Sequence, residues 1–238
     1  MVARMTCTID GWLFDVDELG THVALWVYTN DGQLLKLTDE FQPPFCVTGE
    51  RDALKQLTAR LYRRGWVTGG RWVERTEFWS GATLSALELY VTDASHLSPL
   101  RTLAATLDQQ FQFYNLDIPV AQHYLSRRDL FPLGQLTAQI DERGNVQEIA
   151  ATGSRWAANY APPKLIVMRL SGTAMRPLNP ESRIRLECGD AQQTLWLKEG
   201  AATITAFNQF LAEYNPDVIL SERGDTVLFP ALLQLAKQ

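Results

Sequence analysis

The sequence has few cysteines and no long apolar run. Its three cysteines, Cys7, Cys46 and Cys188, are far apart, odd in number and outside any CxxC or Cys/His cluster. This pattern argues against a disulfide framework and against a zinc site, so we expect buried free thiols. No apolar run approaches the roughly 20 residues that cross a bilayer, and the first residues lack the order of a signal peptide. We therefore expect a cytoplasmic protein with no membrane partner.

The sequence also lacks a glycine-rich phosphate loop, an internal repeat and any low-complexity tract. Hydrophobic residues make up 46% of the 238 residues and charged residues 21%, which is ordinary globular usage and excludes disordered and fibrous classes. A chain of this length holds one large or two ordinary domains. We expect two.

The net charge is −5, and the acidic excess is confined to residues 1–160, because residues 161–238 hold eight basic and eight acidic side chains. Within the acidic part, residues 51–75 carry seven basic side chains against two acidic ones. A local basic patch can bind phosphates even on an acidic protein, since charges act within a Debye length of about 8–10 Å. The alternative is a solvated helix face.

Alternating apolar and polar positions over residues 6–38 predict a three-stranded antiparallel meander. The next elements are expected in the order strand, helix, strand, strand, helix, strand, at residues 45–47, 52–64, 71–78, 83–92, from 98, and 111–114. This βαββαβ order is the ferredoxin-like signature. Many unrelated functions share that signature, so it indicates a fold and no activity.

A further helix is expected at residues 117–128 and a hairpin at residues 133–140 and 146–150. Ala161-Pro162-Pro163 then stiffens the chain, so we place a domain boundary near residue 160, giving domains 1–160 and 161–238. The second domain is expected to contain strands 164–170, 183–188 and 194–198, helix 203–214, strand 217–221 and helix 229–237. This βββαβα order begins a ribonuclease-H-like layer. The predicted class is α/β (α+β), with the ribonuclease-H-like part incomplete.

Three passages carry a family resemblance. They are Phe113–Leu125 running on to Leu133, then Pro162–Ser171, then Asn215–Pro230. In order and spacing they resemble the end of the N-terminal domain, the first exonuclease strand and the second exonuclease motif of family B DNA polymerases. The resemblance spans nearly the whole chain. It implies an N-terminal domain followed by the first part of a 3′–5′ exonuclease domain, either as a fragment or as a fold that another chain completes.

The resemblance also shows what is missing. The exonuclease of that family holds two divalent metals with carboxylates, but this chain has Arg169 and Ser171 in place of the acids of the first strand. Arg223 stands where asparagine is usual and Leu228 where aspartate is usual, and no acid lies in residues 164–176. Arg169 would place a permanent cation at the metal position. We expect no catalytic residue, no metal site and no cofactor, with Mg²⁺ relevant only if a polymerase domain is also present.

In family B polymerases the N-terminal domain contacts the single-stranded template, and some archaeal members read uracil there. No residue pattern in this sequence identifies a uracil pocket. Basic and aromatic side chains of the 51–75 stretch are our candidates for weak contact with single-stranded DNA, namely Arg60, Arg63, Arg64, Arg71 and Trp72, with Trp66 nearby. The alternative is a core pair of tryptophans beside solvated arginines.

The leading hypothesis is therefore a noncatalytic scaffold that contacts template DNA. A second hypothesis is a protein-interaction module that docks the remainder of a polymerase, or a replication or repair partner. A third is a nuclease with relocated metal ligands, for which Asp190, Glu199 and Asp225 are the candidates.

Overall fold

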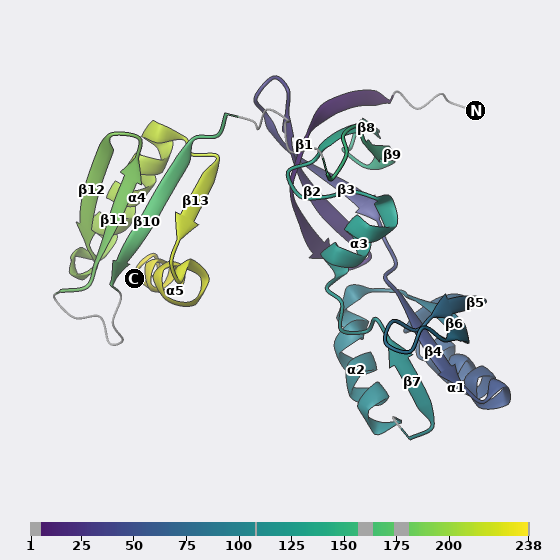
Figure 1. Ribbon diagram of the computed structural model, residues 1–238. Helices are drawn as coiled ribbons and strands as arrows, with labels where there is room; N and C mark the ends of the chain where they lie inside the picture. The colour runs from purple at the N-terminus through teal and green to yellow at the C-terminus, as the bar shows by residue number, and fades with distance from the viewer. Residues whose placement is uncertain (1–5, 108, 157–163, 174–180, 238) are drawn as a thin grey trace. The chain divides into compact units, whose positions relative to one another are not determined.

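The computed structural model describes residues 6–107, 109–156, 164–173 and 181–237. The chain divides into two compact units, residues 1–163 and residues 164–238, and each has its own hydrophobic core (Figure 1). The boundary predicted near residue 160 lies outside the described residues. None of the described helices is long and apolar enough to cross a membrane.

The first sheet of unit 1 has the order β3-β2-β1-β8-β9 and is antiparallel throughout. Its strands are β1 (Cys7–Leu19), β2 (His22–Thr29), β3 (Leu34–Glu40), β8 (Gln135–Ile140) and β9 (Val146–Ala151). The predicted meander is thus confirmed, and the later hairpin joins it through β1. The two edge strands of this sheet, β3 and β9, approach each other. A β-bridge and a side-chain hydrogen bond of 2.8 Å link Thr38 of β3 to Asn145, which directly precedes β9.

The second sheet of unit 1 has the order β5-β6-β4-β7, again antiparallel. Its elements are β4 (Pro44–Gly49), α1 (Arg51–Arg63), β5 (Val67–Thr76), β6 (Thr83–Val91), a 3₁₀ turn (Ala94–His96), α2 (Leu97–Thr106) and β7 (Phe111–Tyr114). This is the predicted ferredoxin-like arrangement. Helix α1 starts where the Glu50 carboxylate accepts hydrogen bonds from the backbone N–H groups of Asp52 and Ala53. It buries three leucines at helical spacing.

Helix α3 (Val120–Arg128) links the two sheets of unit 1. It begins three residues later than the sequence predicts, because Pro119 has an extended backbone. At its C-terminal end two consecutive arginines reach different sheets. Arg128 pairs with Asp39 of β3 at 2.6 Å, and Arg127 pairs with Glu88 of β6 at 2.5 Å. Tight connections of this kind fix one sheet against the other.

Unit 2 is a four-stranded sheet of order β12-β11-β10-β13 in which only β10 and β13 are parallel. Its elements are β10 (Val167–Thr173), β11 (Arg183–Cys188), β12 (Ala191–Trp196), a 3₁₀ turn (Leu197–Glu199), α4 (Ala201–Tyr214), β13 (Val218–Ser221), a π-helical turn (Gly224–Leu228) and α5 (Phe229–Leu235). The predicted order is confirmed. Strand β12 starts earlier than predicted because Gly189 adopts a positive φ of 57°, which permits a tight turn from β11.

Candidate nucleic-acid interface

Strand β5 sends neighbouring side chains to opposite faces of its sheet. Trp72 lies opposite Leu87 of β6 on the face that α1 covers, whereas Arg71 lies opposite Glu88 on the other face. This follows from the two-residue period of a strand. The structure therefore does not bring the five predicted DNA-contacting residues together on one surface. They occupy three places.

The first place is a groove of about 480 Å³ between α1 and β5, which we call the α1–β5 groove. Its lining is mainly apolar and includes Trp72 and Tyr62, which are 41% and 62% exposed, and the predicted Arg63. The guanidinium carbon of Arg51 lies 5.2 Å from the Trp72 ring centroid, within cation–π range. An exposed aromatic pair with cations beside it is the surface type that stacks bases of single strands.

The second place is the opposite flank of α1, where Arg60 and Arg64 lie one helical turn apart and are both exposed. The guanidinium carbon of Arg64 lies 4.8 Å from the Trp66 ring, which also stacks with His96 at 6.4 Å. Trp66 is partly buried against the core of unit 1. The core alternative thus holds in part for Trp66, and it does not describe Trp72.

The third place holds Arg71 and surrounds a buried carboxylate. Glu88 is 1% exposed and accepts hydrogen bonds from Arg71 and Arg75 at 2.8 Å each, from Arg127 at 2.5 Å, and from the Tyr90 hydroxyl at 2.8 Å. Burial by itself would raise the pKa of Glu88, but these donors together lower it to about 2. The carboxylate therefore stays ionised, and three arginines around one anion leave a net charge of +2.

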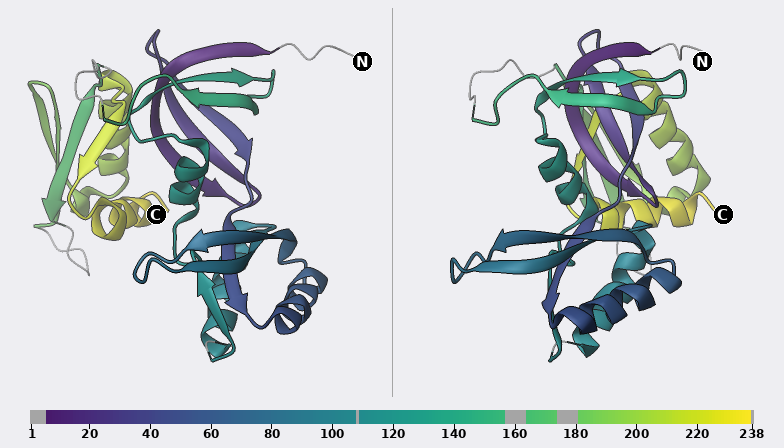
Figure 2. Two further views of the ribbon diagram at one scale, coloured as in Figure 1. Left: turned by 45° about the vertical axis from the view of Figure 1, so that its right-hand side comes forward. Right: turned by 90° about the vertical axis from the view of Figure 1, so that its right-hand side faces the viewer.

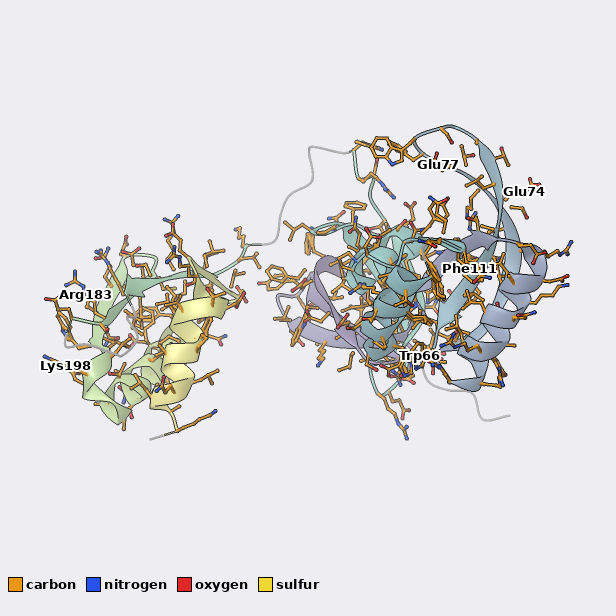
Figure 3. All side chains as sticks on the ribbon, turned by 90° about the horizontal axis from the view of Figure 1, so that it is seen from below. Trp66, Glu74, Glu77, Phe111, Arg183 and Lys198 are labelled. Carbon is orange, nitrogen blue, oxygen red and sulfur yellow. The ribbon has the colours of Figure 1, made fainter. Side chains whose placement is uncertain are left out.

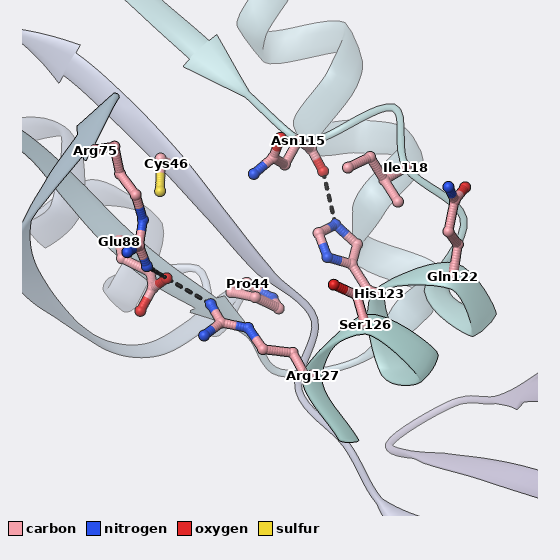
Figure 4. Close-up of a pocket in the computed structure, with 10 residues that line it drawn as sticks. All are labelled: Pro44, Cys46, Arg75, Glu88, Asn115, Ile118, Gln122, His123, Ser126 and Arg127. Carbon is pink, nitrogen blue, oxygen red and sulfur yellow. Dashed lines mark hydrogen bonds and ion pairs between the residues drawn. The ribbon is translucent and has the colours of Figure 1, made fainter. Parts of the chain in front are cut away.

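A polar pocket of about 400 Å³ adjoins this cluster on the sheet face away from α1 (Figure 4). Arg75, Glu88 and Arg127 line one side. His123 lines the other, and its Nε2 lies 2.9 Å from the backbone oxygen of Asn115. Burial lowers the pKa of His123, which favours the neutral imidazole. The pocket thus combines half-exposed guanidinium groups with neutral hydrogen-bonding groups, a lining suited to an anionic or strongly polar group.

The four positions where the exonuclease motifs depart from the family pattern lie in different surroundings. Arg169 and Ser171 are exposed on the same face of β10, the face that α4 and α5 do not cover. Arg223 is exposed and has a left-handed backbone with φ of 56°, two residues after the end of β13. Leu228, 1% exposed, is part of the unit 2 core. A leucine at that position packs against apolar neighbours and offers no metal ligand.

The acids proposed as relocated ligands lie in three different elements. Asp190 is in the β11–β12 turn, Glu199 is in the 3₁₀ turn that precedes α4, and Asp225 is in the π-helical turn. Among the residues that the structure describes, no three His, Cys, Asp or Glu side chains are grouped so that they could hold a metal ion.

The tip of the β5–β6 hairpin is a feature that sequence reasoning missed. Phe78 and Trp79 are 85% and 88% exposed and contact each other edge to face at 5.0 Å. The tip is ordered by Glu77, whose carboxylate accepts from the backbone N–H groups of Trp79 and Ser80. The hairpin extends away from the rest of unit 1 (Figure 2). The available signal was two adjacent aromatics beside Ser80-Gly81, where turns are normally polar.

Comparisons with known proteins agree with this architecture. No family model matches the chain. A DNA polymerase of Archaeoglobus fulgidus is 24% identical, and the match covers 97% of this chain and 31% of that protein. The solved structure of the family B DNA polymerase from the hyperthermophilic archaeon Pyrobaculum calidifontis has the same fold, with a TM-score of 0.75 and 21% identity. That match covers 96% of this chain and 32% of the polymerase chain.

The chain thus spans about a third of the length of the two proteins it matches. Both matches extend through unit 1 and unit 2, since they cover nearly all of this chain. The resemblance of this chain to the N-terminal region of a family B DNA polymerase, first indicated by three sequence passages, is thereby confirmed.

Proposed function

We propose that the chain is a noncatalytic N-terminal and exonuclease-like portion of a family B DNA polymerase, or of an inactivated homologue, and that it contacts single-stranded template DNA. The observation that carries the proposal is the α1–β5 groove. Trp72 and Tyr62 offer exposed rings to bases, and Arg51 and Arg63 offer charge to phosphates. Salt bridges among the described residues do not include either arginine.

The experiment is a fluorescence anisotropy titration of a labelled oligothymidylate at several salt concentrations. Removing both groove aromatics, Tyr62→Ser with Trp72→Ser, should weaken binding at least tenfold, because each stacked base contributes about 1–3 kcal/mol. The matched control, Phe78→Ser with Trp79→Ser, also removes two exposed aromatics from unit 1 and should keep the affinity within about twofold. Equal losses in both variants would remove the groove from the proposal.

The noncatalytic part of the proposal is supported by the side chains at the four motif positions, which are two arginines, a serine and a buried leucine. A 5′-labelled oligonucleotide incubated with the chain and Mg²⁺ or Mn²⁺ should remain intact. Degradation that disappears when Asp190, Glu199 or Asp225 is changed to alanine would overturn this part and favour a nuclease with relocated ligands.

A second candidate function, docking of a protein partner, is favoured by the hairpin tip. Two aromatics held almost fully exposed by an ordered turn are the kind of anchor that protein interfaces bury. For this function the informative partner is a separately produced polypeptide that carries the remaining two thirds of such a polymerase. Phe78→Ser with Trp79→Ser should abolish that association, while Tyr62→Ser with Trp72→Ser should preserve it.

A further inference from the structure

Unit 2 holds an indole with two cations beside it on the open face of its sheet. Leu195 and Leu197 point into the core, so Trp196 between them points to the opposite face, and it is absent from the core cluster. The guanidinium carbon of Arg183 and the Nζ of Lys198 each lie 5.6 Å from the centroid of the Trp196 ring. Figure 3 shows Arg183 and Lys198 at the same end of the unit.

The strand register extends this feature across the sheet. Arg183 of β11 lies directly opposite Trp196 of β12, and Arg185 lies opposite Thr194 and, on the other side, Ser171 of β10. Both helices of the unit pack on the far face, where they bury apolar side chains. Over β11 and β12 the open face is therefore polar and basic, and Trp196 is its large aromatic group, whereas Val167 of β10 and Leu220 of β13 are exposed apolar side chains on the other half of the sheet.

The charges on this face are largely unneutralised. Glu187 is the only carboxylate at the outward positions of β10, β11 and β12 in the described residues, and it pairs with Arg185 at 2.7 Å. Among those residues no ion pair involves Arg169, Arg183 or Lys198. The neighbouring residues 174–180, which the structure does not describe, contain no acidic residue in the sequence. These cations remain available to an anionic ligand.

We propose that this open face is a binding site for single-stranded nucleic acid, with a base stacked on Trp196 and the adjoining phosphates held by Arg183 and Lys198. A base that stacks on the ring takes the place of one cation, and that cation moves to the phosphate next to it. Aromatic platforms flanked by guanidinium and ammonium groups bind single strands in this way, with little preference for sequence. The site lies in unit 2 and does not depend on the α1–β5 groove of unit 1.

The test uses the full chain, both in the wild-type background and with Tyr62→Ser and Trp72→Ser, so that loss at the groove and loss at this face are measured separately. Three probes of equal charge are titrated: an oligothymidylate, an abasic oligonucleotide of the same length, and polyglutamate. The variants are Trp196→Leu, Trp196→Phe, and Arg183→Gln with Lys198→Gln. The chain offers a matched control in unit 1, where Nζ of Lys36 lies 5.6 Å from the Trp26 ring.

In both backgrounds Trp196→Leu should weaken oligothymidylate binding at least fivefold, because one stacked base is lost. Trp196→Phe should keep most of the wild-type affinity, because a phenyl ring still stacks one base. Trp196→Leu should not change binding of the abasic strand. Arg183→Gln with Lys198→Gln should lower the salt slope by about 1.4, since each single-strand phosphate contact contributes about 0.7. Trp26→Leu and Lys36→Gln should change affinity less than twofold.

The proposal fails if Trp196→Leu and Trp26→Leu have equal effects, or if Trp196→Leu weakens the abasic strand as much as the oligothymidylate. Polyglutamate that binds as tightly as the oligothymidylate, and loses affinity only with the two cations, would identify a site for acidic peptides instead. If Trp196→Leu does not fold, as judged by its thermal melt, the salt slope of Lys198→Gln alone tests the proposal. Its side chain is exposed and lies outside the core of unit 2, and an unchanged salt slope in that variant would overturn the proposal.

Discussion

The two faces of the β5-β6-β4-β7 sheet carry similar numbers of basic side chains and differ in what those side chains contact. On the face away from α1, Arg71, Arg75 and Arg127 surround Glu88. On the α1 face, Arg51 and Arg63 lie beside exposed aromatic rings, with no carboxylate paired to either among the described residues. The first set shares a buried carboxylate, and in the proposed function the second set meets the DNA. A count of cations in the sequence does not separate the two roles.

The largest expected effect is on stability and belongs to the Glu88 face. Glu88→Gln removes the one buried anion that three half-exposed arginines share, and leaves their mutual repulsion uncompensated. A hydrogen bond to a charged group contributes about 1.5–3 kcal/mol, and solvent screening of the half-exposed arginines reduces the gain from each ion pair, so the free energy of unfolding should fall by about 2 kcal/mol in urea denaturation at pH 7. Glu74→Gln on the same hairpin is the control, because Glu74 is exposed and should change stability by less than about 0.5 kcal/mol. A loss as small as the control's would show that the cluster is not structural.

The stabilisation of the fold by the Glu88 ion pairs depends on pH. The pKa of Glu88 is lowered in the folded chain from its usual 4.5 to about 2. A carboxyl group with a lowered folded-state pKa stabilises the fold fully above its unfolded pKa, and this contribution disappears as the pH falls toward the folded pKa. The difference in unfolding free energy between wild type and Glu88→Gln should therefore be constant above about pH 5 and shrink between pH 4.5 and 2. A difference that stays constant down to pH 2.5 would contradict the assigned ion pairs.

Much of the fold could be predicted from the sequence, because its signals are local. Alternation along β1 to β3, the leucine spacing of α1 and the order of elements in unit 2 all act over a few residues. The pairing of β1 with β8 joins Cys7 to Ile140, and no local pattern specifies a contact over that separation. Helix α3 was placed too early because the sequence signal of Ile118-Pro119 suits a helix start, whereas Pro119 lies just outside the helix.

The candidate interface was predicted less well, because it depends on contacts between residues far apart in the chain. The sequence presents residues 51–75 as one basic patch, but strand alternation separates Arg71 from Trp72, and Arg63 lines the α1–β5 groove whereas Arg60 does not. Glu88, which pairs with Arg71, also pairs with Arg127 of α3, 39 residues later in the chain. Only the assembled sheet shows which arginines are neutralised.

A smaller effect concerns the salt dependence of DNA binding. Arg51→Gln and Arg63→Gln should each lower the slope of log affinity against log salt by about 0.7, the value for one single-strand phosphate contact. Arg60→Gln and Arg64→Gln, which remove the same charge from the opposite flank of α1, should leave the slope unchanged. Equal changes in all four variants would indicate that only the overall charge of unit 1 matters.

The most direct measurement compares two adjacent residues of β5. In a titration with labelled oligothymidylate, Trp72→Ala should weaken binding about fivefold or more, because a stacking contact of about 1–3 kcal/mol is lost. Arg71→Gln should change it less than about twofold, because that guanidinium is paired with Glu88 on the other face at 2.8 Å. An Arg71→Gln variant that folds normally and loses as much affinity as Trp72→Ala would contradict the assignment of the DNA contact to the α1–β5 groove.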